Sequence, residues 1–157
     1  MKIAALFDLD GVLIDSESIY TVFWNRMNEL FPTGIDNFAY VIKGTTLPQI
    51  LDRYFPDPKV QAELRVYLKK QEAEMVYRIF PGVERFLKAL KEKDIPTAIV
   101  TSSNDAKMKV LFDSLPGFRD YFDVVVTDTD VTRSKPDPQG YMLAAERLGV
   151  PSEHCVV

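Results

Sequence analysis

A short apolar segment near the N-terminus, followed at once by two carboxylates, constrains the fold of this chain more than any other feature. Residues 3–7 read Ile-Ala-Ala-Leu-Phe, which is typical of a strand buried on both faces of a parallel sheet. Asp8 and Asp10 follow, and Gly11 permits a sharp exit from the strand. Because ligands bind at the carboxyl ends of strands in open α/β sheets, we expect both acids to lie in a functional site.

Two carboxylates this close in sequence repel each other unless a cation lies between them or one stays protonated. Hard carboxylate oxygens on a short loop suit Mg²⁺, so Asp8 and Asp10 are predicted metal-binding residues. A simple turn after a strand could contain the same four residues, Asp-Leu-Asp-Gly. This segment by itself leaves both interpretations open.

Composition and charge exclude several classes of protein. A chain of 157 residues with 46% hydrophobic and 27% charged residues is typical of one globular domain that can carry an inserted subdomain. The net charge of −4 and the scattered basic residues argue against a nucleic-acid partner. One cysteine and one histidine exclude disulfide scaffolds and histidine-pair zinc sites. A strand directly after Met1, and no apolar run of about 18 residues, predict a cytoplasmic protein that does not bind membranes. The oligomeric state cannot be read from the sequence.

Strands and helices alternate along the chain after one early interruption. Helical periodicity dominates residues 15–80, with a last predicted helix from Lys59 to about Ile79. Apolar runs predict three further strands, at residues 97–100, 122–126 and 154–157. This order predicts an α/β fold: a doubly wound parallel (Rossmann-like) sheet core, residues 1–14 and 81–157, with an all-helical cap, residues 15–80, inserted after the first strand. The insertion leaves the core next to the acids, so we expect it to close over them as a lid.

Two further polar groups follow predicted strands. Thr101 and Ser102 end the second strand, and Lys135 follows the third. Each is ordinary by itself, because hydroxyls before a helix often cap it and a loop lysine is usually solvated. The carboxyl ends of parallel strands meet at one edge, however, so we expect these residues to lie beside Asp8 and Asp10. Together they offer a nucleophile, a proton donor, hydroxyl donors and a fixed positive charge, which suits phosphoryl transfer.

The segments LFDLDGVL, IVTSS and SKPDP resemble the first three signature motifs of the haloacid dehalogenase (HAD) superfamily, in the same order. The helical insertion resembles the cap of its β-phosphoglucomutase-like and phosphoglycolate-phosphatase-like branch, and the match spans the whole chain. The resemblance implies a Mg²⁺-dependent phosphatase that hydrolyses a small phosphorylated metabolite, or pyrophosphate, through an aspartyl-phosphate intermediate.

The same resemblance implies a role for each residue. Asp8 would be the nucleophile, and Asp10 would protonate the leaving oxygen and then deprotonate the attacking water. Thr101 and Ser102 would hold the transferring phosphoryl group, and Lys135 would screen its charge. Mg²⁺ would bind the Asp8 carboxylate and the Asp10 main-chain carbonyl. A departing alkoxide needs a proton and a departing halide does not, so an acid at position 10 favours phosphate esters over carbon–halogen substrates.

The predicted cap departs from the sugar phosphomutases of this branch. These carry an Arg shortly after a cap-loop glycine, whereas Gly44 is followed here by Thr45 and Thr46, and Tyr20 stands where they carry a His. Lys43 could replace the Arg only as a point charge. Because a second phosphate loses its bidentate partner, a phosphatase is favoured over the alternative, a sugar phosphomutase. Gly44, Thr45 and Thr46 are the predicted substrate-binding residues of the cap.

The family's fourth motif is an acidic pair that follows the fourth strand and completes the metal site. The sequence stops at Cys155-Val156-Val157, where that strand begins. We expect a fragment of a longer protein, with little or no phosphatase activity as it stands; otherwise the sheet would keep an exposed apolar edge. A non-catalytic binding module, or an inactive fragment, is the second alternative.

Overall fold

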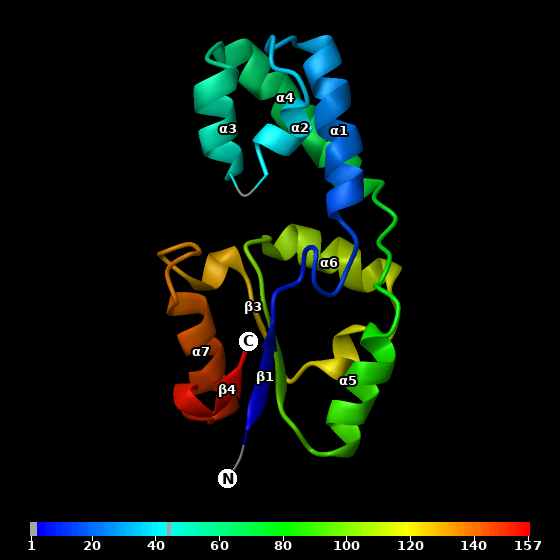
Figure 1. Cartoon of the computed structure of the whole chain (residues 1–157), viewed down its shortest axis with the longest axis vertical. Helices are drawn as coiled ribbons and strands as arrows, with labels where there is room; N and C mark the ends of the chain where they lie inside the picture. The colour runs from blue at the N-terminus through cyan, green and yellow to red at the C-terminus, as the bar shows by residue number, and fades with distance from the viewer. Residues whose placement is uncertain (1–2, 44) are drawn as a thin grey trace. The chain divides into compact units, whose positions relative to one another are not determined.

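A computed structural model describes residues 3–43 and 45–157 of the chain. The chain forms two compact units, which are described separately below. One contains Met1–Asp15 and Val76–Val157 and is built around a sheet, and the other contains Ser16–Met75 and is helical throughout its ordered elements (Figure 1).

The first unit is organised around a parallel sheet. Its strands are β1 (Ala4–Phe7), β2 (Thr97–Val100), β3 (Val124–Val126) and β4 (Cys155–Val156). They lie in the order β3-β2-β1-β4, with Leu6 opposite Ala98 and Ala5 opposite Val156. The final residues therefore pair with the first strand, and the predicted parallel α/β fold is confirmed. The third strand begins at Val124, two residues later than predicted, because Arg119–Tyr121 forms the 3₁₀ turn η1 before it.

Helices cover both faces of this sheet because successive residues of a strand point to opposite sides. The helices of this unit are α5 (Val83–Glu92), α6 (Asp105–Ser114) and α7 (Gln139–Leu148), with short 3₁₀ turns η2 (Asp128–Asp130) and η3 (Ser152–His154). Leu6 of β1 joins a buried cluster with Val100 of β2 and Ala144 of α7. Phe7 instead packs edge-on against Phe86 of α5, at 6.1 Å between ring centroids. Successive residues of β1 thus pack against helices on opposite faces, as predicted for a doubly wound sheet.

Two segments of the first unit pair where the chain leaves the sheet and returns to it. The Asp15 amide donates to the Arg78 carbonyl at 2.8 Å, and the Phe80 amide donates to the Leu13 carbonyl at 3.0 Å. Ile14 and Ile79 form an antiparallel bridge between them. The helix predicted to reach Ile79 therefore ends earlier, at Ala73, because the backbone of the following segment is bonded to the segment after β1.

The helical unit has a core of its own. It contains α1 (Glu17–Leu30), α2 (Phe38–Val41), α3 (Leu47–Tyr54) and α4 (Pro58–Ala73). Trp24 stacks on Phe55 and meets Phe38 edge-on, and Leu51 and Leu64 are fully buried beside these rings. None of the helices in residues 3–43 and 45–157 has the length and hydropathy to cross a membrane. Burial of these apolar side chains is the main stabilisation available to so small a bundle.

We predict that Leu51→Ala destabilises the helical unit by about 2–5 kcal/mol, because it leaves a cavity in a fully packed core. Trp24 is the one tryptophan of the chain and lies in this core, so its fluorescence during urea denaturation reports on this unit. Val22→Ala, an exposed position on α1, is the matched control and should change stability by less than about 0.5 kcal/mol. Equal effects of the two substitutions would contradict the core described here.

Candidate active site

The turn after β1 holds two carboxylates on either side of a buried anchor. Leu9 is fully buried, and its carbonyl accepts hydrogen bonds from the amides of Leu13 and Ile14 at 2.9 and 3.1 Å. Gly11 has a φ of 76°, a conformation that costs a glycine little. This closed turn fixes the backbone between Asp8 and Asp10, so both carboxylates leave the sheet at its carboxyl edge.

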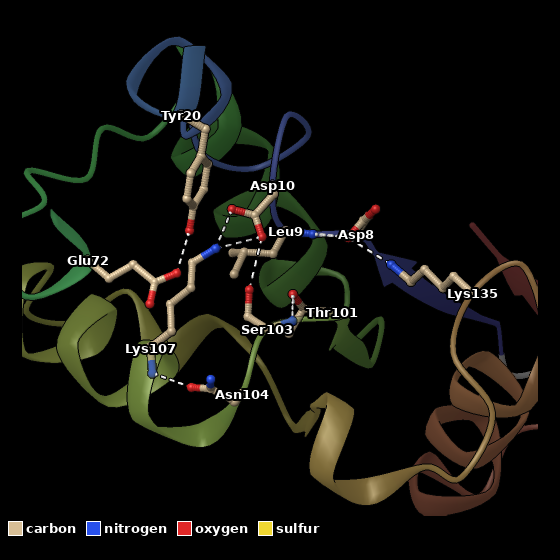
Figure 2. Close-up of polar contacts among 10 residues, drawn as sticks. All are labelled: Asp8, Leu9, Asp10, Tyr20, Glu72, Thr101, Ser103, Asn104, Lys107 and Lys135. Atoms are coloured by element: carbon tan, nitrogen blue, oxygen red, sulfur yellow. Dashed lines mark hydrogen bonds and ion pairs between the residues drawn. The ribbon is translucent and has the colours of Figure 1, made fainter. Parts of the chain in front are cut away.

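Asp8 is held by donors from two directions. Its Oδ1 accepts a hydrogen bond from the Leu9 amide at 2.7 Å and lies 2.8 Å from the Lys135 ammonium (Figure 2). Lys135 also donates to the Val100 carbonyl at 2.9 Å and lies over the Tyr141 ring. The structure therefore brings together the side chains after β1 and before α7, as the motif order predicts. Both side chains remain partly open to solvent: Asp8 is 38% exposed and Lys135 is 27% exposed.

Asp10 is held by a different pair of residues. Lys107 donates to both of its carboxylate oxygens, at 2.9 and 3.1 Å, and the Ser103 hydroxyl donates to Oδ2 at 3.0 Å. Figure 2 shows both donors reaching the carboxylate from the segment that follows β2. Each carboxylate of the pair thus has its own lysine, which relieves the repulsion between them expected from the sequence.

Lys107 and Ser103 contact Asp10 but were not among the residues predicted from the sequence. The Lys107 side chain is only 8% exposed although it lies in the first turn of α6. A lysine at the start of a helix is disfavoured by the helix dipole, which hints at an acidic partner. The hint is weak, because most such lysines are simply solvated.

The hydroxyl residues after β2 differ in their surroundings. Thr101 is buried, and its Oγ1 accepts a hydrogen bond from the Ser103 amide at 3.0 Å, so it shapes the turn that follows the strand. Ser102 is exposed. Both line a concave space that is partly open to solvent, together with Lys135 and Arg133. The lining residues of this pocket do not include Asp8, which reaches it only through its contact with Lys135.

An acidic turn follows β3 beside the same pocket. The hydroxyls of Thr127 and Thr129 donate to Asp105 at 2.7 and 2.9 Å, and Asp128 lines the pocket. Burial, with the nearby Asp105 charge, raises the pKa of Asp128 above its ordinary value. Asp130 behaves in the opposite way, because its hydrogen bond from Arg147 lowers its pKa.

The cap residues predicted to face a substrate are engaged within the helical unit. Gly44 lies outside the described residues. Thr46 precedes α3, and its amide and hydroxyl both donate to Gln49, which is the arrangement of a helix cap. Thr45 donates its amide to the Ile42 carbonyl.

Two further cap residues weighed against the mutase pattern have partners in the helical unit. Lys43 forms an ion pair with Glu17 at 2.9 Å, and this hydrogen bond raises the pKa of the exposed Lys43 ammonium. Tyr20 donates to Glu72 at 3.0 Å. Both side chains are therefore placed by local contacts.

The Asp8 carboxylate has one oxygen that could bind a hard cation. Figure 2 shows its second carboxylate oxygen directed away from both Leu9 and Lys135. Mg²⁺ commonly binds one or two protein carboxylates and completes its octahedron with water and substrate phosphates. Within the described part of the chain, no group of three or more His, Cys, Asp or Glu side chains forms a closed metal cage. The Asp8 oxygen that faces neither Leu9 nor Lys135 would fit a Mg²⁺ ion whose other ligands are mostly water and substrate phosphate.

Comparison with known proteins supplies the family. The family model for haloacid dehalogenase-like hydrolases matches residues 4–157. The chain belongs to the haloacid dehalogenase-like hydrolase family. The motifs read from the sequence and the strand order β3-β2-β1-β4 agree with this membership.

Named relatives of this hydrolase family cover nearly all of the chain. It is 32% identical to the phosphorylated carbohydrates phosphatase of Thermotoga maritima, over 98% of the chain and 74% of that protein. It is 31% identical to hexitol phosphatase A of Escherichia coli, over 97% of the chain and 71% of that protein. The solved structure of CbbY from Rhodobacter sphaeroides in complex with phosphate superposes with a TM-score of 0.76 at 26% identity, over 99% of the chain and 76% of that protein.

We predict opposite stability effects for two substitutions in the acidic turn. Asp128→Asn should raise the melting temperature at pH 7, because the raised pKa means that ionisation above pH 3.8 weakens the folded state. Asp130→Asn should lower the melting temperature, with a loss of no more than about 1 kcal/mol in the free energy of unfolding, because the lowered pKa contributes stability above pH 3.8.

Differential scanning fluorimetry from pH 7 down to pH 3 measures both effects. The Asp128 difference should shrink as the pH falls from 7 toward 3.8, because the raised pKa lets the folded state take up its proton first. The Asp130 difference should persist down to pH 3.8 and shrink below it, because the lowered pKa keeps the folded state ionised to lower pH. Changes of the same sign at pH 7, or changes independent of pH, would contradict the electrostatics of this turn.

Proposed function

We propose that this protein is a Mg²⁺-dependent phosphatase that hydrolyses a small phosphorylated metabolite through an aspartyl-phosphate. The observation that supports it best is the contact between the Asp8 carboxylate and the Lys135 ammonium at the carboxyl edge of the sheet. A nucleophile beside a fixed positive charge suits attack on a phosphate, whose oxygens carry negative charge. The named phosphatases among its relatives support the same assignment.

In the first step, an oxygen of Asp8 attacks phosphorus and the bond from phosphorus to the ester oxygen breaks. Asp10 gives its proton to that oxygen, which leaves as an alcohol. Asp8 is partly exposed and anchored by the Leu9 amide, so one carboxylate oxygen can face an incoming phosphate. Positioned proton transfer of this kind contributes about 10²–10⁴-fold to the rate.

In the second step, water attacks the phosphorus of the aspartyl-phosphate. Asp10, now a carboxylate, takes a proton from that water, and the bond from phosphorus to Asp8 breaks. Inorganic phosphate leaves, Asp8 is again a carboxylate, and Asp10 is again protonated, as at the start of the first step. The hydrogen bonds that Asp10 accepts from Ser103 and Lys107 support a carboxylate at this position in the second step.

The remaining residues bind the phosphoryl group and do not change covalently. Lys135 neutralises part of its charge, and Thr101 and Ser102 line the adjoining pocket. Magnesium, when bound by the Asp8 carboxylate and the Asp10 main-chain carbonyl, would offset the charge that develops on the phosphoryl oxygens. The arrangement of donors therefore favours phosphate over an uncharged substrate.

We also propose that the helical unit acts as a cap that selects the substrate. A cap would contribute Thr45 and Thr46, with Gly44, to the bound molecule. The small size of the substrate, a cytoplasmic location and the absence of a nucleic-acid partner stay predictions from the sequence.

A screen of phosphorylated metabolites, pyrophosphate included, tests the proposed function on protein produced from the complete reading frame. The assay measures release of inorganic phosphate with Mg²⁺ and without any sugar bisphosphate. Turnover under these conditions supports a phosphatase. Conversion of a sugar phosphate that requires a bisphosphate would favour a mutase instead, and no turnover of any phosphate would favour a non-catalytic module.

We predict that Asp8→Asn abolishes phosphate release, by more than about 10³-fold, because an amide cannot serve as the nucleophile. Circular dichroism should show an intact fold, since Asp8 is partly exposed. Asp52→Asn, at an exposed position in the helical unit, is the control and should leave turnover unchanged. Retained turnover in Asp8→Asn would show that another residue is the nucleophile.

We predict that removal of Mg²⁺ with EDTA stops phosphate release, and that added Mg²⁺ restores it. The physical reason is that Lys135 offsets only part of the phosphoryl charge, while Lys107 is paired with Asp10 and offsets none of it. Isothermal titration calorimetry should show Mg²⁺ binding that Asp8→Asn weakens. Full activity in EDTA, with no metal in the protein by mass spectrometry, would overturn the cofactor assignment.

A further inference from the structure

Lys107 lies where a lysine is expected to destabilise the fold. It is the third residue of α6, and its backbone amide donates to the Asn104 side chain that caps the helix, at 2.9 Å. The positive end of the helix dipole disfavours a cation in this first turn. The side chain is also almost completely buried, which disfavours an unpaired ammonium. A lysine here depends on a carboxylate that faces it.

The geometry of that carboxylate is unusually constrained. Lys107 reaches Oδ1 and Oδ2 of Asp10 at 2.9 and 3.1 Å, so the ammonium straddles the carboxylate. Ser103 donates to Oδ2 as well, at 3.0 Å. Two donors from separate elements, the turn after β2 and the helix α6, thus restrict the side-chain rotation of Asp10. The surrounding rigid elements belong to the same unit of the chain.

An ion pair with one buried and one half-buried partner is weak evidence for stabilisation, because the cost of desolvating the charges can exceed their attraction. Apolar residues of similar size would fill the same space at lower cost. The pairing has a clearer use if the orientation of Asp10 matters to the chemistry, since a misplaced proton-transfer group loses much of its effect.

We propose that Lys107 is a positioning residue for Asp10, which it holds, together with Ser103, in the orientation needed for proton transfer. This inference rests on the proposed phosphatase function and assigns a role to a residue outside the three motifs. Lys107 acts through Asp10 and does not bind the substrate. It follows that its effect should disappear when the Asp10 carboxylate is removed.

The test is a double-mutant cycle on protein produced from the complete reading frame, with a substrate found in the screen above. Lys107→Met should lower kcat by on the order of 10–100-fold, the usual effect of losing an orienting partner, and change KM less than threefold. In the Asp10→Ala background the same substitution should cause no further loss of kcat. Lys107→Arg, which keeps a donor and the charge, should recover at least part of the loss.

Controls separate this role from a general effect on folding. Lys109→Met removes a lysine two residues later on α6 that pairs with Asp113 at the surface, and should leave kcat unchanged. Circular dichroism and melting temperatures of all variants are compared, and Lys107→Gln replaces the Met variant if the latter does not fold.

Three results would overturn the inference. The first is a loss of kcat that persists in full in the Asp10→Ala background, which would indicate a structural role. The second is a rise in KM in both backgrounds, which would indicate that Lys107 binds the phosphate itself. The third is parent-like kcat in Lys107→Met. A parent protein that turns over no phosphate compound would overturn the proposed function and this inference together, which distinguishes that failure from the other three.

Discussion

Parallel pairing of β1 with β2 is the constraint on which the site depends. With Leu6 opposite Ala98 and Phe7 opposite Ile99, β1 ends one residue before β2 does. The turns that begin at Asp8 and Thr101 therefore leave the same edge of the sheet within one residue of each other, and parallel pairing of β2 with β3 adds the segment that leads to Lys135. Residues that are more than 90 positions apart in sequence meet because the strand ends do. A slip in this register would move every one of them.

Charge pairing at this edge is more specific than the sequence suggests. Two neighbouring carboxylates require compensation, and the chain supplies a separate lysine for each. Lys135 reaches Asp8 from the segment before α7, whereas Lys107 reaches Asp10 from α6. The two acids therefore have different surroundings: Asp8 keeps an oxygen directed away from its donors, while both oxygens of Asp10 accept hydrogen bonds. Such a difference suits two acids with different tasks.

The helical unit does not depend on the sheet for its core. Trp24, Phe38 and Phe55 form a cluster of edge-on and stacked rings, closed by leucines of α3 and α4. Its polar residues near the predicted substrate loop are also paired locally, as Lys43 is with Glu17. A bundle with its own core can vary in sequence without disturbing the strands that hold the acids. This separation is consistent with a family in which one core serves many phosphorylated compounds.

The sequence by itself determined the parallel sheet, its helices and the motifs at its edge. Apolar runs, turn residues and helical periodicity are local signals. They were sufficient to predict where β2 lies and that Asp8 and Lys135 lie close together. Only the tertiary structure decided which cation faces which acid, that Thr101 shapes a turn, and that the chain after Ala73 is bonded to the segment beyond β1. Lys107 could not be selected from the sequence, because a lysine in a first helical turn looks like any solvated residue until the carboxylate 97 positions away is folded against it. The reason is physical: periodicity reports burial along one element. Pairing of charges depends instead on the distance between elements that are far apart in sequence and meet only in the folded structure.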